Sequence, residues 1–175
     1  LHWLAGGAVP ELGPECWRVS WVTCLRQMVS WCDRETSIAC LDTALTTLRI
    51  TRSTILDVFA DACAADQLIA GACETGSDSG VESVVRQRLL AEGIRTVQQV
   101  QFPGARVDMH VHGTRVLIEI DGRKFHDNAD TWERDNIRDA ELVARNFVVI
   151  RLSYWQIFAD WNWCLRIIRE AISLG

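Results

Sequence analysis

The chain has 175 residues, of which 49% are hydrophobic and 23% are charged, and its formal net charge is -5. This balance is typical of a folded globular protein and excludes an intrinsically disordered one. No run approaches the ~18 apolar residues of a membrane span, so we expect no membrane span, no signal peptide and a cytoplasmic protein.

Seven cysteines are present, and four of them, Cys16, Cys24, Cys32 and Cys40, recur every eight residues. This spacing matches no usual zinc motif, and an odd count does not favour a closed set of disulfides. We therefore expect small, reduced, buried thiols.

The first part of the chain, residues 1–75, is predicted to be helical. Apolar residues at helical spacing predict helices over 20–32, 34–48 and 53–64, with Ser20 as the first N-cap. A linker rich in small and polar residues follows over 73–79. This region holds no motif of catalytic type; it could contact a protein partner, and a homodimer is open.

The second part, residues 76–175, has a mixed pattern. A helix is predicted over 81–90 with Gly93 as its C-cap signal, then strands over 97–101, 107–111 and 116–120. A helix over 129–145, a strand over 147–152 and a last helix ending near Ile172 complete it. The order predicts an α/β domain, a mixed β-sheet flanked by helices, preceded by the small helical region.

Three carboxylates mark a candidate site. Asp108 and Glu119 each interrupt an apolar strand, and Glu82 lies on the helix before them. Burying such charges is costly unless something pairs with them. Two neighbouring inward carboxylates repel each other, and a divalent cation relieves that repulsion. The pattern indicates a hard-metal site of the kind that activates water for phosphodiester hydrolysis.

These residues carry a family resemblance over a little over half of the chain, from Ser79 to about Ile172. It resembles the PD-(D/E)XK endonuclease-like proteins related to very-short-patch-repair (Vsr) mismatch endonucleases, the domain of unknown function 559. The matching motifs, in order, are SGVES, RVD, VLIEIDG, the Phe125-His126 pair, WERDNIRDAELVARN and FVVIRLS.

The resemblance implies a restriction-endonuclease-like fold and DNA cleavage with Mg²⁺ or Mn²⁺. It implies metal-ligand roles for Glu82, Asp108 and Glu119. Asp121 stands where the wider superfamily has its motif lysine, so Lys124 or His126 would act on the water in its place. Three arginines are candidate contacts to DNA phosphates: Arg123, Arg134 and Arg138.

Each candidate also has a purely structural interpretation. Glu82 completes a capping box that begins at Ser79. Asp108 could be an edge-strand charge, and Glu119 could pair across the hairpin with Arg106 or Arg115. His126 could be a solvated loop histidine, and the arginines at 134 and 138 could belong to a salt-bridged helix face. Trp155, Trp161 and Trp163 could stack on bases, but such residues more often pack in a core.

The sequence therefore predicts a cytoplasmic, magnesium-dependent endodeoxyribonuclease that acts in defence against foreign DNA or in repair. The net negative charge does not exclude DNA, because carboxylates at a metal site are neutralised by the ion that they hold. The alternative is an inactive nuclease-fold module that binds DNA or protein in a toxin-antitoxin or phage-encoded regulatory system. Metal-dependent cleavage separates the two.

Overall fold

The computed structural model describes residues 19–102, 105–121 and 140–174. Their contacts divide the chain into two compact units, with the division between Thr75 and Gly76. Each unit has its own hydrophobic core. Within the described ranges, no helix has both the length and the apolar character needed to cross a membrane.

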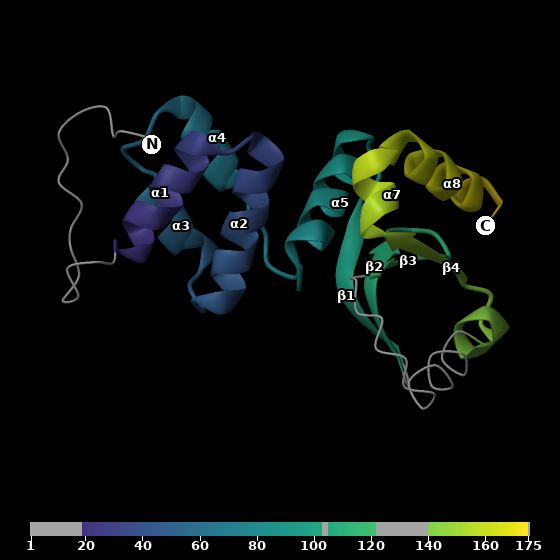
Figure 1. The fold of residues 1–175 in the computed structure, drawn as a ribbon. Coiled ribbons are helices and arrows are strands. Elements are labelled where there is room, and N and C mark those ends of the chain that lie inside the picture. Colours follow the sequence, from purple (N-terminus) through teal and green to yellow (C-terminus); the bar gives the residue numbers. More distant parts are fainter. Residues whose placement is uncertain (1–18, 103–104, 122–139, 175) are drawn as a thin grey trace. The chain divides into compact units, whose positions relative to one another are not determined.

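The first unit consists of four helices, α1 (Trp21–Trp31), α2 (Arg34–Thr47), α3 (Arg52–Val58) and α4 (Ala64–Gly71) (Figure 1). The first three begin where a side chain caps the helix: Ser20, Asp33 and Thr51 each accept a hydrogen bond from the backbone three residues later, which satisfies an otherwise unpaired N–H. The predicted cap at Ser20 is confirmed.

The third helix predicted over 53–64 is wrong as a single element. α3 ends at Val58, and α4 begins at Ala64. Phe59, at the end of α3, is 1% exposed in the core of this unit. The Nε2 of Gln67 donates to the carbonyls of Ala60 and Ala62, each at 3.0 Å. These two bonds satisfy carbonyls that a continuous helix would have paired internally.

The expectation of buried thiols is wrong for half of the described cysteines. All six are free, but Cys24, Cys32 and Cys63 are exposed, while only Cys73 and Cys164 are buried. On α1 the inward stripe consists of Leu25 and Val29, four residues apart. Cys24 therefore falls on a different side of the helix.

The second unit contains α5 (Gly80–Ala91), β1 (Thr96–Phe102), β2 (Ala105–Val111), β3 (Val116–Asp121), β4 (Val148–Ser153), α7 (Tyr154–Ala159) and α8 (Trp161–Leu174). The sheet order is β1-β2-β3-β4; β1–β2 and β2–β3 are antiparallel and β3–β4 is parallel. The predicted mixed α/β architecture is confirmed.

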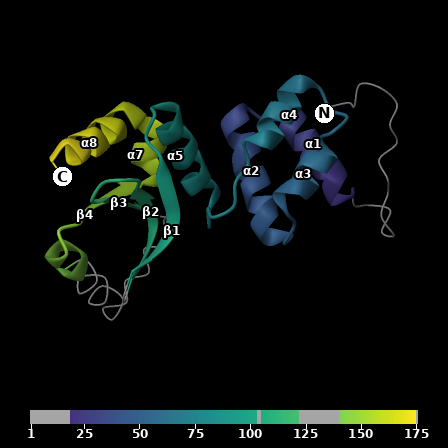
Figure 2. The same cartoon turned by 180° about the vertical axis from the view of Figure 1, so that it is seen from behind.

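The two faces of this sheet pack against different helices. On one face, residues of α5, α7 and α8 form the main core with the strands, as Figure 1 and the reverse view in Figure 2 show. Trp161 and Trp163 pack against this core. On the other face, Val107 and Leu117 pack with Leu142. Leu142 belongs to the helical stretch 140–144; the rest of the helix predicted over 129–145 lies outside the described residues.

The single last helix predicted to end near Ile172 is two helices, α7 and α8. Ser153 and Gln156 form a capping box that starts α7 directly after β4. Asp160 then leaves helical geometry, with φ -147° and ψ 71°, and its Oδ1 accepts a hydrogen bond from the backbone N–H of Trp163 at 3.0 Å. This cap starts α8 in a new direction.

Candidate active site

Glu82 is held at the N-terminus of α5. The Oγ of Ser79 caps the helix by accepting from the backbone N–H of Glu82 at 3.2 Å. The Glu82 carboxylate turns back, and its Oε2 accepts from the backbone N–H of Asp78 at 2.8 Å. Only 6% of the residue is exposed. The carboxylate therefore caps the helix entrance, one residue earlier than a regular capping box requires, and is buried at the same time.

Asp108 lies where β1 and β2 lose their regular pairing. The register joins Gln98 to Met109 and Val100 to Val107, but Gln99 and Asp108 between them are not paired. The backbone of Gln99 has a positive φ of 50°, a left-handed conformation that non-glycine residues rarely adopt in a strand.

The same break changes the face on which β2 places its side chains. Val107 packs in the smaller cluster with Leu117, whereas Met109 packs in the main core with Ile118. Residues two apart in a regular strand share a face. Asp108 therefore occupies the position at which the alternation of faces switches.

The Asp108 carboxylate also replaces part of the β2–β3 ladder. The register between these strands joins Met109 to Ile118 and His110 to Leu117. Beyond it, Oδ2 of Asp108 accepts from the backbone N–H of Ile120 at 2.8 Å. Because β2 lies between β1 and β3, the interpretation of Asp108 as an edge-strand charge is wrong.

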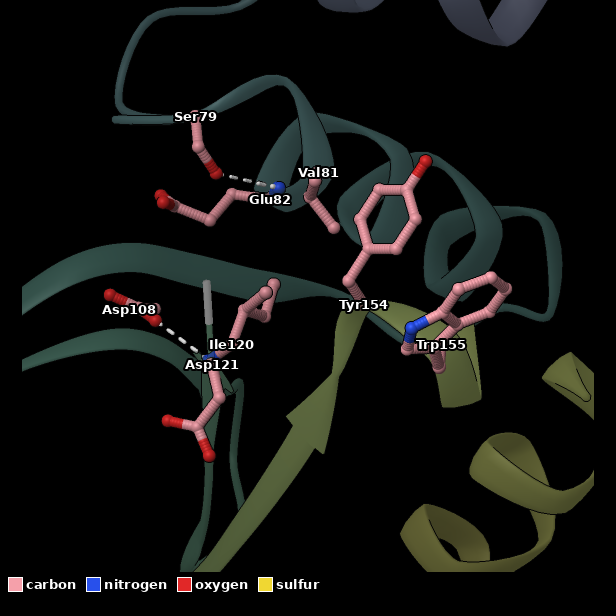
Figure 3. A pocket seen from close by; sticks show the side chains of 8 residues that line it. All are labelled: Ser79, Val81, Glu82, Asp108, Ile120, Asp121, Tyr154 and Trp155. Atoms are coloured by element: carbon pink, nitrogen blue, oxygen red, sulfur yellow. Dashed lines mark hydrogen bonds between the residues drawn. The ribbon is translucent and has the colours of Figure 1, made fainter. Parts of the chain in front are cut away.

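Gln99 links the two carboxylates. Its Nε2 lies 2.8 Å from Oε2 of Glu82 and 3.4 Å from Oδ1 of Asp108. Figure 3 shows both carboxylates at the same end of a pocket. Burial raises the pKa of Glu82, and the negative charge of Asp108 adds to the effect; hydrogen bonds from Asp78, Ser79 and Gln99 oppose it. Two acids thus share a position that favours a compensating cation.

The pocket has a volume of about 440 Å³. Its acidic end is formed by Glu82 and Asp108, and the opposite end by the aromatic side chains of Tyr154 and Trp155; Asp121 also lines the pocket, but its carboxylate points away from the other two (Figure 3). The two aromatic residues are 44% and 59% exposed. The pocket thus combines a charged end with an apolar end that is open to a ligand.

Neither Asp121 nor Glu119 points its carboxylate at the Glu82–Asp108 pair. Asp121, at the exposed end of β3, lines the pocket; Glu119 is not among the described residues that line it. Ile118 and Ile120 both pack against the main core, so alternation directs the Glu119 side chain to the other face of β3. There its register partner on β4 is Arg151. The peptide that joins Glu119 to Ile120 nevertheless contacts the carboxylate of Asp108.

The donor set suits a hard divalent cation. Carboxylate and amide oxygens are the ligands that such ions prefer, and Mg²⁺ is usually held by one or two carboxylates while it keeps several waters. The Glu82–Asp108 pair provides two. Within the described ranges, no three His, Cys, Asp or Glu residues lie close enough together to form a larger metal cluster.

Several predicted residues lie outside the described residues: Arg123, Lys124, His126, Arg134 and Arg138. Arg106, one of the alternative partners considered for Glu119, forms an ion pair with Asp78. This pair fixes the loop that donates to Glu82.

The sequence did not indicate two residues of the site, Gln99 and Tyr154. Gln99 gave no signal, because a glutamine in a strand is unremarkable until its backbone and its neighbours are known. Tyr154, which follows β4 directly, was not singled out, although its neighbour Trp155 was considered as a base-stacking residue, and both line the pocket.

Comparison with known proteins identifies a family for the second unit. The model of the REase_MTES_1575 family matches residues 81–172, a range that contains both linked carboxylates and the aromatic end. An uncharacterised protein of Haemophilus influenzae is 33% identical over 79 residues, 45% of this chain and 63% of that protein. This chain thus covers less than two thirds of that relative's length. No solved structure matches.

Proposed function

Because the chain belongs to the restriction-endonuclease-like family REase_MTES_1575, we propose that its second unit is a metal-dependent nuclease that hydrolyses DNA phosphodiester bonds. The mixed sheet flanked by helices is consistent with a restriction-endonuclease-like fold. A fold alone does not establish a catalytic activity, so the nuclease activity is proposed from the residues of the site.

The observation that carries the proposal is the pair of linked carboxylates. Glu82 is buried, has a raised pKa and shares one amide donor with Asp108. Ionised acids in this arrangement repel each other, and burial disfavours the charged form of Glu82. A protein retains such a pair where a ligand of opposite charge compensates it, and carboxylate oxygens select Mg²⁺ or Mn²⁺.

When bound, a divalent cation would polarise the phosphate and lower the pKa of a bound water. Glu82 and Asp108 would hold it, and the hydrogen bonds from Asp78 and Ile120 would fix their carboxylates before substrate arrives. Preorganised charges of this kind are usually the largest contribution to catalysis.

Glu119, Asp121, His126 and Lys124 complete the proposed site. Asp121 lines the same pocket. Asp108 accepts a hydrogen bond from the backbone N–H of Ile120, the residue that follows Glu119. For Glu119 to be a ligand, its side chain has to turn toward Asp108. The proposed relation to very-short-patch-repair endonucleases supports His126 as the group that activates water, with Lys124 as the alternative.

DNA fits the two ends of the pocket. A phosphate would lie at the ion, and the exposed rings of Tyr154 and Trp155 offer apolar faces to the adjoining base or deoxyribose. Stacking on aromatic rings tolerates any base, because every base has a π face. Arg123, Arg134 and Arg138 are the proposed phosphate contacts. A role in defence or repair in the cytoplasm fits such a substrate.

The test is nicking of supercoiled plasmid by the purified chain in Mg²⁺, in Mn²⁺ and in EDTA. We expect relaxed product only with a divalent ion, and loss of that product in Glu119→Ala and Asp108→Asn. A chain that binds DNA but cuts it in neither ion would instead be an inactive nuclease-fold module. Cleavage that persists in EDTA would contradict the metal dependence.

A further inference from the structure

We propose that Gln99 is the positioning residue of the ion site: its amide links Glu82 to Asp108 while no ion is present, and it turns its oxygen toward the ion when one binds. This inference rests on the proposed function, since it assumes a cation at this carboxylate pair. It assigns a role to a residue that no sequence motif indicated.

The amide nitrogen of Gln99 is within hydrogen-bond distance of both carboxylates. This nitrogen, Nε2, is 2.8 Å from Glu82 and 3.4 Å from Asp108. Its two hydrogens therefore carry the partial positive charge that separates two acids. Without an ion, this donor takes the place of the compensating cation.

The backbone of Gln99 has an unusual conformation for a strand residue. Gln99 keeps a φ of 50° in the middle of β1, and the Gln99–Asp108 pair is missing from an otherwise continuous register. Such a conformation is unfavourable and persists where the surroundings enforce it, often at functional sites. Here it lets the side chain reach both acids.

The oxygen of the Gln99 amide, Oε1, is buried and lacks a hydrogen bond among the described residues. Buried polar atoms are normally paired. A cation and an amide N–H₂ repel each other, so the amide must leave the position between the acids when an ion enters. Rotation about its terminal torsion exchanges Nε2 for Oε1, a neutral acceptor that suits the ion or its water.

The experiment measures Mn²⁺ binding by the full-length chain, using calorimetry and the electron paramagnetic resonance signal of free Mn²⁺. Two variants of nearly the same shape separate the roles. Gln99→Met removes both the donor and the acceptor, whereas Gln99→Glu keeps acceptors, removes the donor and adds a charge. Gln101→Met is the control, because Gln101 is an exposed glutamine of the same strand. Thermal unfolding without metal is recorded for all chains.

We expect Gln99→Met to weaken Mn²⁺ binding about tenfold, the lower end of the loss typical of residues that orient ligands. Gln99→Glu is expected to tighten it by about the same factor, because an added carboxylate raises the affinity of oxygen sites. The two variants are thus expected to change the Mn²⁺ affinity in opposite directions. If Gln99 only supported the fold, both substitutions would change the affinity in the same direction. Shifts in the same direction, or two affinities equal to that of Gln101→Met, would overturn the inference.

Failure of this inference and failure of the proposed function are distinguishable. If the unmodified chain binds no Mn²⁺, both are wrong. If it binds Mn²⁺ with the expected variant pattern yet never cuts DNA, the role of Gln99 stands and the nuclease activity is refuted. If it cuts DNA but the two variants bind Mn²⁺ alike, only the role of Gln99 is refuted.

Discussion

Oδ2 of Asp108 lies 2.8 Å from the backbone nitrogen of Ile120, so a side chain takes the place of a main-chain acceptor between β2 and β3. The register of these strands ends at the pair of Met109 and Ile118, and Ile120 lies two residues further along β3. Asp108 therefore has a structural role, as the acceptor for Ile120, and a proposed chemical role, as a metal ligand. Substitutions can separate the two roles.

Asp108→Asn is expected to preserve the fold and abolish DNA cleavage. The Asn Oδ1 can still accept from Ile120, but an amide binds a divalent cation weakly compared with a carboxylate. Asp108→Ala is expected to lose activity and also about 1–3 kcal/mol of unfolding free energy, because a partly buried N–H loses its acceptor. Plasmid nicking and urea denaturation measure the two effects; equal stability of the two variants would contradict the structural role.

Glu82→Gln is expected to stabilise the metal-free protein, and more so at higher pH. The pKa of Glu82 is raised in the folded chain, with burial as the main cause. Between the ordinary and the raised pKa the folded state binds more protons than the unfolded state, so the unfolding free energy falls as pH rises through that interval. Glutamine does not titrate and escapes this loss.

The measurement is urea denaturation in EDTA at about pH 4 and about pH 8, on either side of the ordinary glutamate value. The advantage of Glu82→Gln over the unmodified chain should grow between the two pH values. An advantage that is equal at both, or larger at the lower pH, would show that ionised Glu82 is not disfavoured by folding.

Divalent ions are expected to raise the unfolding temperature of the unmodified chain. A ligand that binds only the folded state stabilises it by about 2.7 kcal/mol at a concentration one hundred times its Kd. Asp108→Asn and Glu82→Gln should lose this gain. Glu119→Ala decides the third ligand: a retained gain in Mn²⁺ would mean that the ion is held from the pocket side alone.

Gln99→Gly is expected to be more stable than Gln99→Ala by about 1 kcal/mol, because glycine accepts a positive φ that alanine resists. Both variants lack the amide, so they differ only in the backbone at φ 50°. Urea denaturation in EDTA compares them. Equal stabilities would mean that the left-handed conformation is not maintained without the side chain.

Trp155→Ala is expected to raise KM for DNA while kcat changes little. The residue is 59% exposed at the apolar end of the pocket, and stacking on an aromatic ring contributes about 1–3 kcal/mol per base. An effect on KM alone is typical of binding that ground state and transition state share. Trp31→Ala, at an exposed tryptophan of the first unit, serves as the control and should leave KM unchanged.

The sequence predicted the order of the helices and strands well, because each depends on local periodicity and capping. Ser20, Ser79 and Gly93 mark helix ends that the structure has. The errors fell where the chain turns without Gly or Pro. Between Phe59 and Cys63, Gln67 donates to the carbonyls of Ala60 and Ala62, and at the second break Asp160 accepts from the backbone N–H of Trp163. These side-chain bonds end the helices without a residue that punctuates the pattern.

The candidate site divides in the same way. Glu82 and Asp108 could be named from the sequence, because a carboxylate among apolar residues needs a compensating charge wherever it is buried. Asp121, which is exposed, was named only through the family resemblance. Alternation along β3 was the physical limit: it directs Glu119 away from Ile118 and Ile120, and only the tertiary structure shows which face borders the pocket.

By itself the sequence determined an α/β unit with acidic residues in its central strands, since hydrophobic periodicity and charge placement are local properties. Only the tertiary structure decided which acids meet. A left-handed residue at Gln99 interrupts the β1–β2 pairing and brings its amide within reach of both Glu82 and Asp108. That conformation is unfavourable for the isolated segment, and it is maintained by packing between residues distant in the chain.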